Sequence, residues 1–325
     1  MEIEQKKYFA IVDLVRGVAA LMVVLCHFGG ISFFNSKLIT KFFYFGTYGV
    51  HMFFIVSGFV IPYSLYKSYK IKTFFRYIFK RSIRIDIPYF VILIIIGLKV
   101  YYLQPHLFSY GKLMAHFLYL PPFLDYEYYD PVFWSLTVEF QFYMVMALIA
   151  PLLSSDKKII KWSVFVLFLS SVFITNVNLF FISKYTDLFS LGILIFFFKT
   201  KQISKLWYLL VSLFIIIIIG YTKGFNIAAA STIAFYVISF LKADNKMIRF
   251  GGKISYSLYL THNIIRTFFF SNFMIKLFEI EEMSDFNKFF YLLVMIASAL
   301  VTSIFFEKLV ENPSKILSRK ILPKN

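Results

Sequence analysis

The chain has 325 residues, of which 60% are hydrophobic, 22% aromatic and only 16% charged, and its mean hydropathy is +0.74. Soluble domains are about 45–50% apolar and about 25% charged, so this composition excludes a soluble protein. The net charge of +17 is divided into short clusters between apolar runs, which is typical of cytoplasmic loops and does not suit a nucleic-acid partner.

Long, continuous apolar runs predict an all-α, polytopic membrane helix bundle in a lipid bilayer. We expect about ten transmembrane helices, at roughly 8–28, 42–66, 86–104, 132–153, 161–177, 185–199, 206–221, 225–241, 254–274 and 286–308. Basic residues concentrate at 67–84, 157–161, 199–205, 242–253 and 308–324, which places both termini in the cytoplasm. The outer connections keep only Lys37, Lys41, Lys112, Lys184, Lys223, Lys276 and Lys288.

A single integral membrane domain is expected over residues 1–325, with a basic cytoplasmic tail from about 309 and no appended extracytoplasmic domain. The first apolar run has no plausible cleavage site and is expected to stay in the mature protein. The single cysteine, Cys26, lies in that run, so no intrachain disulfide is possible.

The first helix carries three ionisable groups in DLVRGVAALMVVLCH: Asp13, Arg16 and His27. Arg16 and His27 are eleven residues apart and therefore share one stripe, about 16 Å apart along the axis. Ionisable groups at this depth are costly and normally face a bundle interior or a wet cavity. The alternative is structural, with Asp13 and Arg16 as an i,i+3 ion pair and His27 at the far interface.

The fourth predicted helix opens with PVFWSLTVEFQFY, in which Ser135, Glu139 and Tyr143 fall on one face. Glu139 lies at a depth similar to that of His27, so the two could form a general acid/base pair. A glutamate hydrogen-bonded only for packing is the alternative.

The ninth predicted helix contains GKISYSLYLTHNIIR, in which Ser255, Tyr259, His262 and Arg266 form one polar stripe. Lipid would not tolerate that stripe, so it must line a bundle interior or a pore. A purely structural hydrogen-bond network would also explain it.

The first inner loop carries Arg81 and Arg84, three residues apart where a helix enters the membrane. Paired guanidinium groups suit phosphate recognition, although anchoring by the positive-inside rule is the favoured interpretation from these residues alone. The preceding segment GTYGVHMFFIVSGFVIP supplies Gly49, Ser57 and Gly58 for close helix contact, with His51 near its outer end.

The five histidines show no metal-ligand spacing, so we expect no metal and no permanently bound cofactor. The outer segment of about 105–131 is rich in Tyr and Pro, and GKLMAHFLYL within it could form a short interfacial or re-entrant helix.

Several motifs in order give a resemblance that covers nearly the whole chain. They are DLVRGVAALMVVLCH, GVHMFFIVSGFVI, RSIR with Pro88 after it, FWSLTVEFQFY, ISYSLYLTHN and VENPSKIL. Together they resemble acyltransferase family 3, a family of integral membrane O-acyltransferases.

The resemblance implies transfer of an acyl group from cytoplasmic acyl-CoA, most often acetyl-CoA, to a hydroxyl of an extracytoplasmic carbohydrate such as a surface polysaccharide or lipid-linked sugar. It makes His27 the catalytic base with Arg16 as its partner, and Arg81 and Arg84 the donor-binding pair. Glu139, His262 and Glu311 also fall on family motif positions. We assign Glu139 to the catalytic group. The expected substrate-binding or pore-lining residues are Asp13, His51, Ser135, Ser255, Tyr259, His262 and Glu311.

His51 stands where many relatives have Asp. This difference either changes the acceptor site or has no effect. A bacterial cytoplasmic membrane is the expected location. The main alternative function is a transporter or flippase for a lipid-linked or acylated small molecule, since polar interior faces also suit a carrier. A non-catalytic membrane scaffold is a further alternative.

Overall fold

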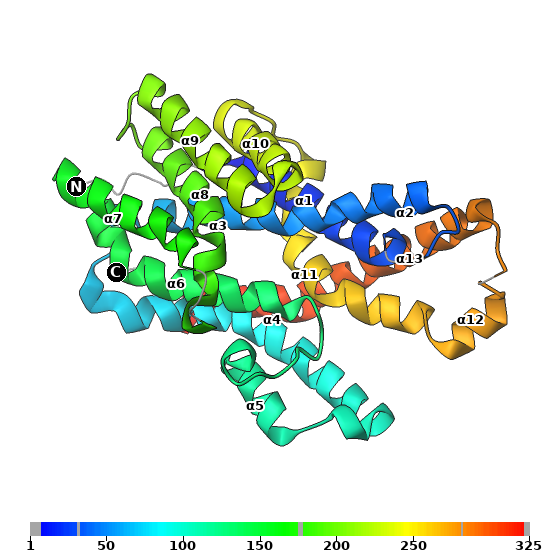
Figure 1. Ribbon diagram of the computed structural model, residues 1–325. Coiled ribbons are helices and arrows are strands. Elements are labelled where there is room, and N and C mark those ends of the chain that lie inside the picture. Colours follow the sequence, from blue (N-terminus) through cyan, green and yellow to red (C-terminus); the bar gives the residue numbers. More distant parts are fainter. Residues whose placement is uncertain (1–7, 31–32, 175–177, 281, 322–325) are drawn as a thin grey trace. The chain divides into compact units, whose positions relative to one another are not determined.

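The computed structural model describes residues 8–30, 33–174, 178–280 and 282–321 (Figure 1). The chain is 83% helical and its described residues contain no strand, so the all-α prediction is confirmed. The α-helices are α1 (Ala10–Gly29), α2 (Lys37–Tyr44), α3 (Gly49–Leu65), α4 (Phe74–Leu103), α5 (Tyr110–Phe117), α6 (Phe133–Leu153), α7 (Lys158–Ser170), α8 (Thr186–Lys199), α9 (Lys205–Lys223), α10 (Phe225–Phe240), α11 (Lys246–Phe269), α12 (Asn272–Phe278), α13 (Asp285–Phe306) and α14 (Asn312–Ile321).

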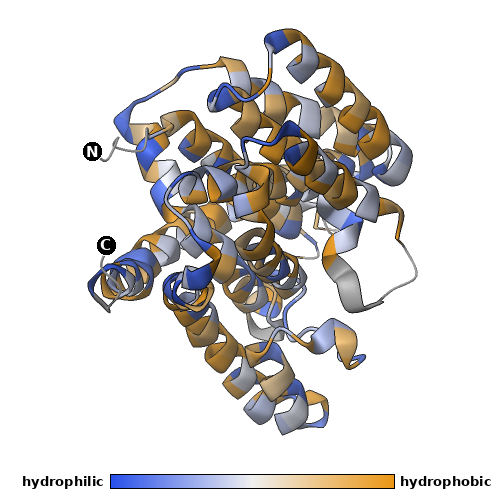
Figure 2. Cartoon of the chain, turned by 90° about the vertical axis from the view of Figure 1, so that its left-hand side faces the viewer, coloured by the Kyte–Doolittle hydropathy of each residue, from blue (hydrophilic) through white to orange (hydrophobic). Residues whose placement is uncertain are grey.

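Five helical stretches within the described residues are long and apolar enough to cross a membrane. They are Ala10–Gly29, Lys37–Leu65, Phe133–Leu153, Lys205–Lys223 and Asp285–Lys320. Figure 2 shows apolar residues along most helices and hydrophilic residues mainly at helix ends and connections. The membrane-helix character is thus supported, whereas the count of about ten spans and the cytoplasmic termini stay predictions.

The remaining expected spans fall short for two physical reasons. The helices α7, α8 and α10 have 13, 14 and 16 residues, and a bilayer core requires about 20. The helices α4 and α11 are longer, at 30 and 24 residues, but charged side chains dilute their apolar character. Residues 175–177, at the end of the expected span 161–177, lie outside the described residues.

The chain divides into two compact units. Unit 1 takes in the residues up to Gly17, His51–Ile78 and Val138–Gly252, and unit 2 takes in Val18–Val50, Phe79–Thr137 and the residues from Lys253 onward. The chain passes from one unit to the other within α1, α3, α4, α6 and α11.

The core of unit 1 is α8, which packs against α7, α9 and α10 (Figure 1). Every residue of α8 from Thr186 to Phe197 is buried. Gly58 of α3 and Gly192 of α8 allow the backbones to meet, because a methyl group on either would overlap backbone atoms of the other helix. The predicted close contact at Gly58 is therefore confirmed, and small residues serve it as they do in other membrane helix pairs.

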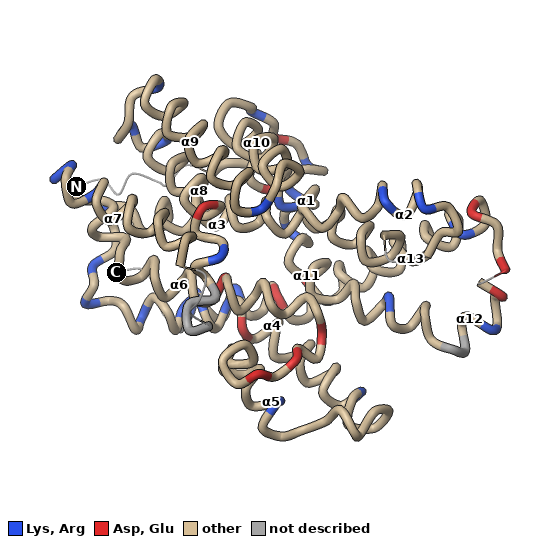
Figure 3. Tube along the Cα trace, in the orientation of Figure 1, with Lys and Arg blue, Asp and Glu red and all other residues tan. Residues whose placement is uncertain are grey.

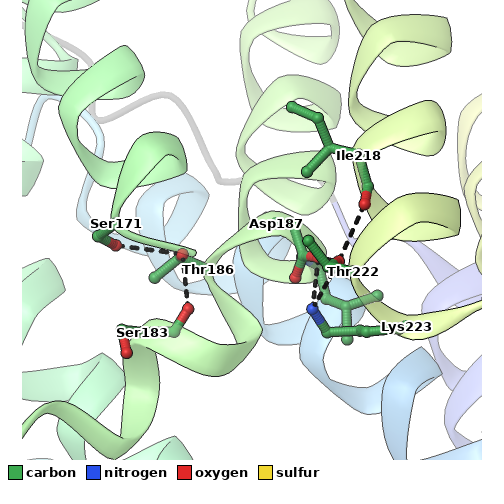
Figure 4. A network of polar contacts seen from close by, with 8 residues as sticks. Ser171, Ser183, Thr186, Asp187, Ile218, Thr222 and Lys223 are labelled. Carbon is green, nitrogen blue, oxygen red and sulfur yellow. Dashed lines mark hydrogen bonds and ion pairs between the residues drawn. The ribbon is translucent and has the colours of Figure 1, made fainter. Parts of the chain in front are cut away.

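A buried ion pair joins α8 to α9 in unit 1. Asp187 accepts from Lys223 Nζ at 2.5 Å and from Thr222 Oγ1 at 2.9 Å, and its side chain is fully buried (Figure 4). A buried carboxylate is stable only when it is paired and hydrogen-bonded in this way. The pair therefore fixes the end of α9 against the start of α8.

In unit 2, the turn η1 (Phe45–Tyr48) and the start of α3 lie directly on the second half of α1. A methyl group at Gly46 would overlap the Met22 carbonyl, and one at Gly49 would overlap the Ala19 carbonyl. Small residues again permit backbone contact. The close contact predicted for Gly49 is confirmed, and it holds the segment of α1 that carries His27.

The start of α13 is bonded to the segment that precedes α2. Asp285 accepts from the backbone N–H groups of Asn35 and Ser36 at 2.7 and 2.9 Å, and Lys288 Nζ donates to Asn35 Oδ1 at 2.7 Å. Figure 3 shows acidic residues in the connection from α12 to α13 and basic residues on α2. These bonds set the position of α2 within unit 2.

Candidate functional site

Two histidines face each other in unit 2. The rings of His27 on α1 and His262 on α11 meet edge to face, with their centroids 5.0 Å apart. His262 is fully buried, and its Nδ1 donates to the Tyr259 carbonyl at 2.7 Å. When this ring is neutral, its Nε2 therefore carries the lone pair.

Both histidines keep a ring nitrogen without a hydrogen bond. Within the described part of the chain, Nδ1 of His27 and Nε2 of His262 are buried and have no hydrogen-bond partner. A buried polar atom that is left unpaired is costly, and a catalytic role is one of the explanations for such an atom. The pair can therefore take up a proton or bind a hydroxyl group.

Arg266 brings a positive charge to the same part of unit 2. It lies one turn after His262 on α11 and interacts electrostatically with His27, His262 and Cys26. Its guanidinium lies against the ring of Phe270, at 5.4 Å from the centroid, and its buried Nε has no hydrogen-bond partner among the described residues. This cation is available to an anion that forms beside the imidazoles.

A buried carboxylate stands next to this group. Asp130 precedes α6, accepts from the Val132 N–H at 3.0 Å and is hydrogen-bonded to Asn263, the neighbour of His262. Burial raises the pKa of Asp130, and the two hydrogen bonds and the charge of Arg266 oppose that shift. Asp130 therefore holds the turn of α11 that carries His262 and Asn263.

The rest of the polar stripe on α11 makes structural contacts. The hydroxyls of Tyr259 and Ser135 lie 2.6 Å apart, and both donate to the Val132 carbonyl. Ser255 is fully buried. The predicted interior orientation of this stripe is confirmed, and its first half fastens α11 to the start of α6.

The turns of α4 that carry Arg81 and Arg84 are fastened to α11 and α14 by three hydrogen bonds to main-chain carbonyls in unit 2. Tyr256 of α11 donates to the Ile85 carbonyl at 2.7 Å. Ser314 and Ser318 of α14 donate to the carbonyls of Arg84 and Lys80 at 3.2 and 2.9 Å. The basic turns of α4 and α14 therefore lie side by side, and Tyr256 is only about 9 Å along the axis from His262.

Glu311 lies at the junction of α13 and α14, in the π-helical turn η7 (Glu307–Glu311). It accepts from Ser257 of α11 and forms an ion pair with Lys315 at 2.5 Å. Glu307 pairs with Lys253 at 3.0 Å. The side chain of Glu311 is thus engaged in joining α11 to the C-terminal helices.

Two of the predicted site residues, Glu139 and His51, belong to the later segments of unit 1. Glu139 accepts from Ser57 Oγ at 2.8 Å and from the hydroxyl of Tyr143, the residue predicted on its face. His51 lies in the first turn of α3 and is partly buried. Because Glu139 belongs to unit 1 and His27 to unit 2, their acid/base pairing stays a prediction.

The first turns of α1 also belong to unit 1. Asp13 accepts from the hydroxyl of Tyr8, and it lies against Gly252 so closely that a methyl group there would overlap it. The alternative ion pair between Asp13 and Arg16 is wrong, because Arg16 pairs with no acid among the described residues. Arg16 is partly buried, on the same helix as His27.

The segment 105–131, which is expected on the outer side, contains the predicted short helix, α5 (Tyr110–Phe117), built around a buried histidine. His116 Nδ1 donates to the Lys112 carbonyl at 2.7 Å, and Nε2 accepts from the Tyr129 N–H at 3.1 Å. Only a neutral ring can make both bonds. Burial, reinforced by the charge of Lys112, lowers the pKa of His116 to about 4 although the Lys112 carbonyl favours the charged ring.

A search for metal ligands gives no site. Within the described residues, no group of three or more His, Cys, Asp and Glu side chains is placed to hold an ion. The polar groups that do gather are two imidazoles, a guanidinium and a carboxylate, a set suited to proton transfer and charge stabilisation.

A protein-family model described as "Acyltransferase domain" matches residues 9–308 of the chain. The chain belongs to acyltransferase family 3. The match extends from the start of α1 to the π-helical turn and includes every residue of the predicted site except Glu311. No curated protein and no solved structure matches the chain.

In this family 3 acyltransferase, sequence reasoning identified His27, His262, Arg81 and Arg84 as candidates. It placed Arg266 in the polar stripe without assigning it to the site, and it missed Asp130. The sequence contains a signal for each of them, because Arg266 continues the polar stripe of α11 and Asp130 directly precedes the fourth predicted helix. Only the fold shows that Arg266 interacts with both histidines and that Asp130 bonds to Asn263, the neighbour of His262.

Proposed function

We propose that this protein is a membrane O-acyltransferase that moves an acyl group from cytoplasmic acyl-CoA to a hydroxyl of an extracytoplasmic glycan or glycoconjugate. Acetyl-CoA is the proposed donor, and a bacterial cytoplasmic membrane is the proposed location. We further propose about ten spans with both termini inside, as the distribution of basic residues predicts.

One observation carries the proposal: a half-buried histidine in an acyltransferase keeps a buried ring nitrogen unpaired beside a second histidine. An acyl transfer to a hydroxyl needs a base at the hydroxyl proton. His27 fits that role by position and by its unpaired nitrogen.

The proposed step is direct. His27 removes the proton of the acceptor hydroxyl while that oxygen bonds to the thioester carbonyl carbon. The carbonyl electron pair moves to oxygen, and Arg266 stabilises the resulting negative charge. The carbonyl re-forms as the carbon–sulfur bond breaks, and the thiolate of coenzyme A takes the proton from His27.

The donor is proposed to enter at the basic turns of α4 and α14. Guanidinium groups of Arg81 and Arg84 suit the phosphates of coenzyme A, which stays in the cytoplasm. From there α11 leads within unit 2 to His262, so the slender pantetheine arm can follow it. Arg16, half-buried on the same helix as His27, is proposed as the partner of that base.

The test uses membranes that contain the protein and acetyl-CoA with a radiolabelled acetyl group. Label is followed into base-labile esters of the extracytoplasmic glycans for wild type, His27→Ala, Arg84→Ala and the matched control His106→Ala. His106 is an exposed histidine of the outer segment. We expect loss of labelling for His27→Ala, a raised KM for acetyl-CoA with Arg84→Ala, and no change for the control.

Equal labelling by wild type and His27→Ala, at equal membrane levels, would remove the catalytic assignment of His27. Uptake or export of labelled material that does not need His27 would instead support the transporter.

A further inference from the structure

Helix α2 has two chemically different faces. Leu38 and Phe42 expose 78% and 69% of their surface on one face, as expected for a helix that rests on lipid. Lys37, Lys41 and Tyr44 recur at i, i+4 and i+7 on another face. The polar face therefore has a separate role.

That second face lines an open groove of about 360 Å³ in unit 2. The lining residues are Gly30, Phe34, Lys37, Thr40, Lys41 and Tyr44. Gly30 closes the last turn of α1 by donating to the Cys26 carbonyl at 2.8 Å. The groove thus begins three residues beyond His27, about 4.5 Å further along the helix axis.

The charges of the groove are available to a ligand. Neither Lys37 nor Lys41 forms an ion pair with any acid in the described ranges. The nearby Asp285 is bonded to the backbone N–H groups of Asn35 and Ser36, ahead of α2. Two unneutralised ammonium groups one turn apart attract a negative group into the groove.

Three of the other lysines assigned to the outer side are engaged. Lys223 is paired with Asp187, Lys288 donates to Asn35, and Lys112 lies over the ring of Tyr129 at 4.7 Å. Lysines are rare on the outer side under the positive-inside rule. The orientation of the chain in the membrane therefore does not explain why two of them line one groove.

The groove also has aromatic walls. Phe34 is buried and stacks on Phe43 with centroids 5.5 Å apart, while Tyr44 exposes 56% of its surface. A fixed apolar wall beside a half-exposed tyrosine suits a ring with an apolar face and a polar rim. A sugar ring has that character.

We infer that this groove binds the acceptor by an anionic group, so that the substrate is a sugar polymer that carries carboxylate or phosphate. The inference rests on the proposed function and specifies its acceptor. Lys37 and Lys41 hold the charged sugar while a neighbouring hydroxyl reaches His27. Carboxylate and phosphate share the chemistry that two ammonium groups recognise.

The test measures binding to the full-length protein in detergent with three oligosaccharides of equal length: one with uronic acids, one with sugar phosphates and one neutral. At least one anionic probe should bind more tightly than the neutral probe, and its affinity should fall as salt rises. Which one binds identifies the anionic group.

The variant Lys37→Gln/Lys41→Gln should bind the anionic probe about tenfold more weakly. The matched control Lys276→Gln removes an exposed outer lysine of α12 and should have no effect. Lys37→Arg/Lys41→Arg keeps the charges and should retain binding, which separates charge from folding. His27→Ala should bind the probe normally yet transfer no acyl group.

Tight binding of the neutral probe, or an unchanged affinity in Lys37→Gln/Lys41→Gln, overturns the groove assignment. The proposed function survives that result if His27→Ala still abolishes transfer. If His27→Ala transfers normally while the lysine variant loses the anionic probe, the groove stands as a binding site and the catalytic proposal fails.

Discussion

His262 keeps its Nε2 unbonded in a ring that meets the ring of His27 edge to face, because its Nδ1 is bonded to the main chain of α11. Nδ1 donates to the Tyr259 carbonyl at 2.7 Å, which leaves the Nε2 lone pair of His262 on a ring 5.0 Å from that of His27. Two imidazoles this close repel each other when both are protonated. They are therefore expected to act as one proton-accepting unit.

Replacing His262 by Asn tests this unit. The Asn amide can still donate to the Tyr259 carbonyl, but it has no atom at the position of Nε2. We expect acyl transfer to fall by about 10²–10⁴-fold with normal membrane levels. The double variant with His27→Ala should be no slower than His27→Ala alone, as for residues that act together. Multiplying losses in the double variant would contradict a shared role.

Arg266 should be required for its charge. Arg266→Gln is expected to lower kcat by about 10²–10³-fold, because a cation beside the reacting carbonyl is lost. Arg266→Lys should restore part of that loss. The control is Arg249→Gln, which removes an arginine from an exposed ion pair with Asp244. A similar kcat in the Gln and Lys variants would indicate that packing matters and charge does not.

The outer segment should lose stability in mild acid because His116 is bonded as a neutral ring. Its pKa falls from the usual 6.5 to about 4, so the unfolded segment binds more protons between these values. Stability is complete above pH 6.5 and declines as the pH falls toward 4, by at most about 3 kcal/mol. Amide exchange at Tyr129, measured at pH 7.5 and 5, checks this.

The comparison for that measurement is His116→Gln, whose side chain cannot titrate. Exchange at Tyr129 in this variant should keep the same protection ratio to a reference amide in unit 1 at both pH values. A wild type whose protection at Tyr129 does not depend on pH would rule out the neutral-ring arrangement.

Removing one partner of the Asp187–Lys223 pair should lower the free energy of unfolding strongly, whereas replacing both partners by apolar residues should lower it little. Asp187→Ala leaves Lys223 without its partner in a buried place, so we expect a loss of about 3–5 kcal/mol. The double variant Asp187→Leu/Lys223→Met should recover most of that stability. Thermal unfolding in detergent measures both, with Asp244→Ala as the exposed control, which should change stability by less than about 1 kcal/mol.

The sequence is sufficient to predict the helical class, the family and the polar stripe of α11, because helical spacing alone puts Ser255, Tyr259 and His262 on one face. Hydropathy does not fix where each span starts. Arg81 and Arg84 lie inside the long helix α4, so its start does not coincide with the start of an apolar run. Short runs such as α8 are apolar for burial in protein rather than for lipid.

Partnerships between distant segments are beyond spacing arguments. Nothing near Glu311 in the sequence indicates Ser257 as its partner, and nothing near His27 indicates Arg266. The pairing of Asp187 with Lys223 was easier to predict, because both residues lie at the same expected outer boundary of neighbouring spans. Complementary charges at matching depth are the one signal that could have linked them.

That last pair has a consequence for how the protein is made. In a bilayer, α8 alone would carry Asp187 without its counter-charge, and an unpaired charge in a membrane segment is costly. Its counter-charge follows only after 36 more residues, at the end of α9. If α8 and α9 both cross the bilayer, as proposed above, we expect them to insert together as a hairpin that brings Lys223 to Asp187.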